Sequence, residues 1–226
     1  MSPEMLYAAS TWVLPVIIAV TLHEAAHGFA AYALGDTTAW RLGRVSLNPL
    51  KHIDPFGTIL MPALLLIMRA PFLFGYAKPV PVNFRALRHP RRDMVLVAAA
   101  GPATNLVLAT MAALLFHVVT FLPSQMAHWL AQNLRNALII NVVLAVFNMI
   151  PLPPLDGGRV MVGLLPKVLA TPLARLEPYG IMILLTLMLL PLLGAQTGVD
   201  FNILSRLISG PTEAILTAIL RLTGNA

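Results

Sequence analysis

The 226-residue sequence contains no cysteine, and charged residues make up only 11% of it. The absence of cysteine excludes a disulfide framework and any zinc site built from thiolates. In soluble globular domains about a quarter of the residues are charged, so this chain has too little charge to cover a soluble surface. Its 58% hydrophobic content and mean hydropathy of +0.80 instead indicate a protein that crosses a membrane several times.

Basic residues outnumber acidic ones, which gives a net charge of +6 and a pI near 10.3. The basic residues lie between the apolar runs, and no aromatic side chains alternate with them on one face, as a nucleic-acid surface would require. We therefore expect anionic lipid headgroups of the bilayer to be their partners, and we expect no nucleic acid to bind.

Long apolar runs predict membrane helices. The first covers about residues 9–34 and ends at Gly35 and Asp36, a typical helix stop. The last, 202–222, carries three charged residues and predicts either an interfacial helix or a poor span. The remaining long runs are 94–122, 134–150 and 179–193. Together they predict an all-α polytopic membrane protein with about four to six membrane helices.

The pattern changes between the first two long runs. Residues 39–49 partly alternate like a short strand, and the spaced prolines of 76–84 keep the backbone extended. The apolar run at 55–68 is shorter than the roughly 20 residues that a spanning helix needs. Non-helical backbone at membrane depth is tolerated only where protein buries it or where it faces water. We therefore predict a short re-entrant, β-like segment here, forming a lip over a water-accessible cavity.

The positions of lysine and arginine predict the orientation in the membrane. If 55–68 is re-entrant, all the basic segments between helices share one side, while 122–133 faces the other side without a lysine or arginine. If 55–68 crossed the membrane, the basic segments would be divided between the two sides. The positive charge of cytoplasmic loops favours the re-entrant arrangement and a cytoplasmic basic face. The basic segments are 36–54, 71–93 and 151–178.

Two histidines and a glutamate interrupt the first apolar run, in the stretch HEAAH. His23 and His27 are four residues apart, so they project from one helical face. Neutral imidazoles at this spacing can bind one zinc ion, and Glu24 between them is placed to act as a general base. Ionisable groups are costly at bilayer depth unless they have partners, so a chance match explains this stretch poorly.

A catalytic zinc site usually has three protein ligands and one open position. The extended pattern HExxHxxGxxH does not supply the third ligand, because Ala30 and Ala33 replace its glycine and its last histidine. The next glutamate after Glu24 is Glu177, which lies too far along the chain for the pattern with a glutamate some twenty residues later.

Asp156 is the third ligand that we favour. It follows the run 134–150, whose end lies on the same side of the membrane as the end of the first run if 55–68 is re-entrant. His27 lies about 10 Å from the end of the first helix, at 1.5 Å per residue, so Asp156 can reach it. His52 is the alternative ligand, although the prolines near it predict a loop. Asp156 before two glycines is also typical of an ordinary turn.

These residues belong to an ordered set of five stretches that resembles a known family. Over roughly residues 12–165 the chain resembles the site-2 protease family of intramembrane zinc metalloproteases, in its compact bacterial form. The loops are too short to hold the regulatory PDZ domain of that family. The five stretches are HEAAH (23–27), RLGRVSLNPLKHIDPFGT (41–58), AKPVPVN (77–83), AAAGPATN (98–105) and NMIPLPPLDGGR (148–159).

The resemblance implies that His23, His27 and Asp156 bind one Zn²⁺ per chain and that Glu24 is the catalytic acid and base. It also implies that Asn148 and the GPATN segment line the same cavity. An oxyanion needs a second donor besides the metal, for which Asn148 is our first candidate and Asn105 our second. The alternative role for either amide is a hydrogen bond between helices.

The expected activity is hydrolysis of peptide bonds within or near the transmembrane helices of membrane-protein substrates. We expect one integral-membrane domain over 1–226, with a catalytic core at about 9–165 and C-terminal helices at about 174–226. The expected location is the bacterial cytoplasmic membrane, with the active site opening toward the cytoplasm.

A metal carrier or an inactive scaffold is the alternative class of function. A carrier should show metal ligands along several spans, whereas His117 and His128 are isolated in the sequence. An inactive scaffold should have lost Glu24, which is present.

Overall fold

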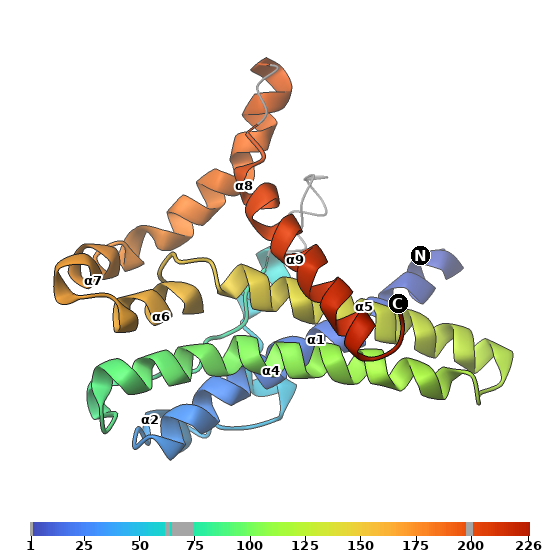
Figure 1. Ribbon diagram of the computed structural model, residues 1–226, viewed down its shortest axis with the longest axis horizontal. Coiled ribbons are helices and arrows are strands. Elements are labelled where there is room, and N and C mark those ends of the chain that lie inside the picture. The colour runs from blue at the N-terminus through green and yellow to red at the C-terminus, as the bar shows by residue number, and fades with distance from the viewer. Residues whose placement is uncertain (1, 62–63, 65–74, 198–200) are drawn as a thin grey trace.

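The computed structural model describes residues 2–61, 64, 75–197 and 201–226. Three long helices lie side by side: α1 (Pro3–Ala33), α4 (Pro90–Val119) and α5 (Ser124–Asn148) (Figure 1). The later helices are α6 (Asp156–Leu164), α7 (Lys167–Ala174), α8 (Gly180–Thr197) and α9 (Ile203–Leu222). The short elements are α2 (Thr38–Arg41), η1 (Pro49–Lys51), η2 (Pro55–Leu60), η3 (Phe84–Ala86) and η4 (Glu177–Tyr179).

Five helical stretches of the described chain are long and apolar enough to cross a membrane. This number confirms the predicted polytopic architecture. Large apolar side chains such as Leu14, Ile17 and Ile18 on α1 are exposed, as expected of a surface that faces lipid. The five stretches are Pro3–Ala33, Pro90–Val119, Ser124–Asn148, Lys167–Pro191 and Ile203–Leu222.

The ends of these helices follow from local chemistry. Helix α1 begins after Ser2, whose hydroxyl caps the Met5 amide, and it stops before Gly35, which has a φ of 110°. Helix α5 begins ten residues before the apolar run that predicted it, at 124 rather than 134. The early residues of α5 are helical but partly polar, and Asn133 among them bonds within the helix to the carbonyl of Trp129.

The predicted strand at 39–49 is wrong, and the described residues contain no strand. The segment starts in α2, because the carboxylate of Asp36 accepts a hydrogen bond from the Thr38 amide at 2.9 Å and so favours a helical turn. Residues 75–83 are non-helical, as predicted, but Pro79 and Pro81 have no N–H with which to continue a ladder. Arg44 binds this segment instead, by donating to the carbonyls of Lys78 and Pro79.

The predicted re-entrant segment 55–68 is only partly described. Its first residues form η2, where the Asp54 carboxylate caps the amides of Phe56 and Gly57. Residues 62–63 and 65–68 lie outside the described residues, so the re-entrant course stays a prediction.

Small side chains bring α4, α5 and α9 close together. Ala109, Ala112 and Ala113 of α4 pack against Leu138 and Val142 of α5, and Ile219 of α9 completes the cluster. Close packing of small residues stabilises helix pairs in membranes, where burial of apolar surface contributes little. The C-terminal run therefore packs as a helix on the long-helix layer, across α5 in Figure 1.

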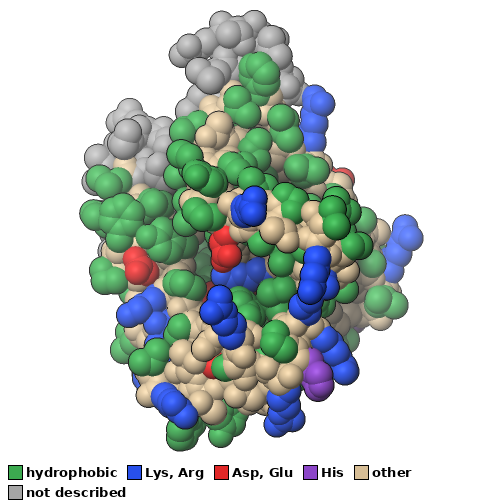
Figure 2. Space-filling model, turned by 90° about the vertical axis from the view of Figure 1, so that its left-hand side faces the viewer, with side chains coloured by type: hydrophobic (Ala, Val, Ile, Leu, Met, Phe, Trp, Pro, Cys, Tyr) green, Lys and Arg blue, Asp and Glu red, His purple; other side chains and the backbone are tan. Residues whose placement is uncertain are grey.

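The basic segments gather at one end of the long helices. Arg91 near the start of α4 donates to the carbonyl of Gly163 in α6, and the Arg88 amide donates to the carbonyl of Leu34 at the end of α1. Figure 2 shows lysine and arginine side chains spread over this end of the molecule. The described parts of the three basic segments thus lie near one end of the long helices, while their side of the membrane stays a prediction.

Candidate metal centre

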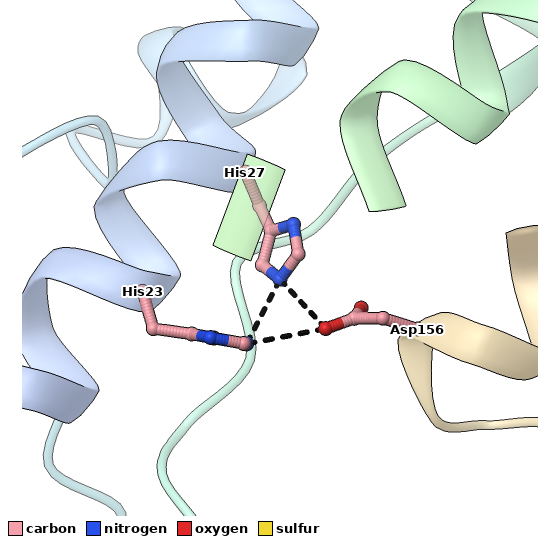
Figure 3. Close-up of side chains that lie close together, drawn as sticks. All are labelled: His23, His27 and Asp156. Carbon is pink, nitrogen blue, oxygen red and sulfur yellow. Dashed lines mark hydrogen bonds and ion pairs between the residues drawn. The ribbon is translucent and has the colours of Figure 1, made fainter. Parts of the chain in front are cut away.

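Three side chains from two helices converge between α1 and α6 (Figure 3). His23 and His27 stand one turn apart on α1, with 3.1 Å between their Nε2 atoms. Oδ2 of Asp156 lies 3.2 Å from Nε2 of His23 and 3.3 Å from Nε2 of His27. All three side chains are buried. The structure thus brings together the three residues that the sequence predicted as a ligand set.

The break between α5 and α6 places Asp156. Prolines at 151, 153 and 154 prevent α5 from continuing, and α6 begins at Asp156 itself. A Cβ atom on the next residue, Gly157, would lie 2.2 Å from the carbonyl oxygen of Met149. Only glycine therefore allows α6 to start against the end of α5, which carries the Asp156 carboxylate to the two imidazoles.

Burial raises the pKa of Asp156, but the hydrogen bonds that His23 and His27 donate from Nε2 when their imidazoles are protonated outweigh burial and lower this pKa to about 2. The carboxyl group is therefore ionised at neutral pH, which is the form that binds a metal.

In each imidazole Nδ1, which points away from the centre, is a hydrogen-bond donor. Nδ1 of His27 lies 2.7 Å from the carbonyl oxygen of Val97, which can only accept, so this nitrogen carries the proton. Nδ1 of His23 lies 2.6 Å from Oδ1 of Asn105, an amide oxygen. Both neutral imidazoles therefore present the lone pair of Nε2 to the centre, as metal-binding histidines do.

The centre fits a cation. Two Nε2 lone pairs and a carboxylate oxygen meet within 3.3 Å of one another, and all three are acceptors. Oδ2 of Asp156 is buried and has no hydrogen-bond donor among the described residues. Acceptors placed so close repel one another unless a positive charge lies between them, and two imidazoles with one carboxylate form a ligand set that suits Zn²⁺.

Gly101 of α4 forms the wall behind the imidazoles. A Cβ atom at this position would lie 2.5 Å from Cε1 of His23 and 2.5 Å from Nε2 of His27. The absence of a side chain at 101 therefore leaves the room that the two imidazoles occupy.

Glu24 lies beside the extended segment rather than among the three ligands. Its Oε2 accepts a hydrogen bond from the Val80 amide at 2.8 Å, and Val80 itself is buried. The side chains of Val45 and Val80 reach Gly28, one turn further along α1, so both irregular segments lie against the HEAAH helix.

Three other predicted candidates lie elsewhere or have different partners. The Asn148 amide donates to the carbonyl of Leu144 in its own helix, and no hydrogen bond among the described residues joins it to the ligand set. The oxygen of Asn105 contacts Nδ1 of His23, one of the three candidate ligands. Nε2 of His52 bonds to the Ser46 carbonyl, and His52 is outside the cluster.

The sequence did not single out Val80, Val97 or Asn141 as parts of this site, and Gly101 entered only as the first residue of the GPATN segment. Val80 and Val97 act through backbone atoms, so residue type gives no sign of them. Asn141 does leave a trace, because it is a polar residue inside an apolar run.

The chain has relatives among known proteins. The model of Peptidase family M50 matches residues 115–191, which include Asp156. Two bacterial relatives carry the description "Putative zinc metalloprotease". YwhC of Bacillus subtilis is 41% identical over 184 residues, which cover 80% of this chain and 80% of YwhC. Rip2 of Mycolicibacterium smegmatis is 29% identical over 178 residues, which cover 78% of this chain and 66% of Rip2.

No solved structure matches the chain. The similarity to YwhC nevertheless extends over four fifths of both sequences, and the family model matches the chain from the end of α4 into α8. The chain therefore belongs to peptidase family M50, the site-2 protease family of zinc metalloproteases.

Proposed function

We propose that this protein is an intramembrane protease, which hydrolyses peptide bonds within or near the membrane-spanning helices of other membrane proteins. The observation that carries the proposal is the convergence of His23, His27 and Asp156, with Glu24 on the same helix as the two histidines. Two of the three side chains belong to a helix that is long and apolar enough to cross a membrane. A hydrolytic site in such a helix can reach peptide bonds that lipid hides from a soluble protease.

His23, His27 and Asp156 would hold one zinc ion per chain, which leaves a coordination position for water or substrate. When bound, zinc supplies a Lewis acid that polarises the scissile carbonyl and lowers the pKa of a water molecule. Glu24 would take a proton from the attacking water at its carboxylate and pass one to the leaving amine. The Val80 amide orients the carboxylate through the hydrogen bond to Oε2.

Asn148, at the end of α5, is our candidate donor to the oxyanion that forms on the substrate. Its amide donates to the Leu144 carbonyl at 3.0 Å, so the side chain would have to rotate and release this bond when substrate is present. Asn105 is a weaker candidate for this role, because both ends of its amide already have partners in the protein.

The metal centre also distinguishes a protease from a metal carrier. Within the described residues, His23, His27 and Asp156 are the one group of three or more potential metal ligands that lie close enough to share an ion. A carrier requires further sites along its path. One site beside a general base is instead what hydrolysis requires.

The substrate class follows from the position of the site. A helical substrate hides its carbonyl groups in hydrogen bonds, so it must unwind locally before it is attacked. We therefore expect helix-breaking residues near the cut to favour cleavage.

The orientation proposed is that of a protein in the bacterial cytoplasmic membrane, with the basic end of the long-helix layer and the active site open to the cytoplasm. The gathering of lysine and arginine at that end supports it (Figure 2). We propose further that residues 1–226 act as one integral-membrane domain, with the core at about 9–165 and supporting helices from about 174 onward.

The test is to incubate the purified protein in lipid vesicles with single-span substrates and to locate the cut by mass spectrometry. We expect cuts inside the spanning segment, in the half nearer the cytoplasmic end, and we expect a zinc chelator to prevent them. A substrate in which leucine replaces the helix-breaking residue serves as the matched control and should be cut more slowly. Cuts confined to water-exposed segments would contradict the proposal.

A further inference from the structure

Asn105 joins the three long helices at the metal centre. Its side chain is fully buried in α4. Its oxygen Oδ1 lies 2.6 Å from Nδ1 of His23 on α1. Its nitrogen Nδ2 donates to Oδ1 of Asn141 on α5 at 2.8 Å and to the carbonyl of Ala19 on α1 at 3.3 Å. One amide group therefore contacts the histidine at one end and α5 at the other.

The direction of this amide determines which tautomer His23 adopts. An amide can turn by about 180° and exchange its oxygen for its nitrogen. With the oxygen toward His23, the imidazole must carry its proton on Nδ1, which leaves a lone pair on Nε2. With the nitrogen toward His23, Nδ1 would have to accept, so the proton would move to Nε2. That second tautomer has no lone pair to offer a metal at the centre.

Asn141 and the carbonyl of Ala19 both set the direction of Asn105, and the bond to Asn141, at 2.8 Å, is the shorter of the two. The amide nitrogen of Asn141 donates to the backbone carbonyl of Ala137 at 2.8 Å, and a carbonyl can only accept. Asn141 must therefore turn its own oxygen toward Asn105. Asn105 in turn must present its nitrogen to that oxygen, and its own oxygen is left for His23.

We infer that Asn141 and Asn105 are positioning residues that hold His23 in its metal-binding tautomer. The inference rests on the proposed function, because the tautomer matters for activity only if His23 binds zinc. His27 needs no such support, since its partner is the Val97 carbonyl, which cannot turn. The two histidines therefore depend on different parts of the chain, and the dependence of His23 extends as far as α5.

The simpler alternative is that these amides only hold the helices together. Asn136 provides the comparison within the same helix. It is as buried as Asn141, and its amide also ties α5 to α1, by donating to the Thr11 carbonyl at 2.9 Å. Asn136 has no hydrogen bond to Asn105 or to a histidine among the described residues.

The experiment measures zinc affinity by competition with a chelator. Loss of an outer hydrogen-bond partner typically weakens metal binding by about 10–100-fold, and we expect such a loss for Asn141→Leu. Asn136→Leu is the matched control and should bind zinc within about threefold of the wild type.

Two results would overturn the inference: Asn141→Leu binding zinc as tightly as the wild type, or Asn136→Leu weakening zinc binding as much as Asn141→Leu. Nitrogen NMR of the metal-free wild type near pH 9, where imidazoles are neutral, gives a second reading that needs neither a variant nor zinc. His23 should be protonated at Nδ1, and protonation at Nε2 would also refute the inference. Failure of the wild type to bind zinc would instead count against the proposed function, while the NMR result would still decide the tautomer.

Discussion

Replacing Glu24 by glutamine should leave zinc bound and reduce the cleavage rate by about 10² or more, the usual loss when a general base is removed. Glutamine has nearly the same size as glutamate, and its side-chain oxygen can still accept the hydrogen bond from the Val80 amide. The amide cannot accept a proton from water at neutral pH. The expected effect is therefore on the chemical step rather than on the metal or on folding.

The measurement is zinc content beside the cleavage rate of a single-span substrate. Glu4→Gln is the matched control, because Glu4 lies in the first turn of the same helix and is exposed. That variant should keep both its zinc and its rate. Cleavage by Glu24→Gln at the rate of the wild type would show that another group accepts the proton.

Replacing Gly101 by alanine should weaken zinc binding by about 100-fold or more. Loss of a hydrogen-bond partner of a metal ligand weakens binding by about 10–100-fold, and displacement of the ligand itself should cost at least as much. The new methyl group would lie 2.5 Å from atoms of both imidazoles, so at least one histidine would have to move away from the centre. Alanine favours a helix by about 1 kcal/mol relative to glycine, so a weaker α4 would not explain the loss.

Gly210→Ala in α9 is the matched control, since apart from its chain neighbours and the backbone of its own helix nothing lies within 4 Å of the Cβ atom it would add. This variant should keep its zinc. The same chelator competition serves both variants. Wild-type affinity in Gly101→Ala would mean that the imidazoles adopt another arrangement when they bind metal.

The sequence predicted the parts of this protein that depend on residue type and spacing. The spacing of His23 and His27 placed both imidazoles on one helical face, and the structure has them there. Asp156 was predicted to lie beside them because it follows the break after the apolar run 134–150, and the structure brings its carboxylate within 3.3 Å of both nitrogens. The membrane helices followed from apolar runs, whose signal is strong because lipid leaves few alternatives.

The parts that were missed depend on contacts distant in sequence or on backbone atoms. The alternation of apolar and polar residues at 39–49 suggested a strand. The Asp36 carboxylate, which accepts a hydrogen bond from the Thr38 amide, instead favours the helical turn α2. The first ten residues of α5 are helical despite their polarity, because the glutamine, methionine, alanine and leucine residues among them favour a helix whether or not the run is apolar. Asn105 was considered as an oxyanion donor, and its contact with His23 became visible only once α1 and α4 lay side by side.

The central claim is that His23, His27 and Asp156 together bind one zinc ion. It is tested most directly by zinc content together with X-ray absorption at the zinc edge, measured on the wild type, His23→Ala and Asp156→Ala. We predict about one zinc per wild-type chain, with imidazole nitrogens at about 2.0–2.1 Å and a carboxylate oxygen at about 2.0–2.2 Å, and loss of most of the metal from both variants. Full zinc content with an unchanged spectrum in both variants would contradict the claim.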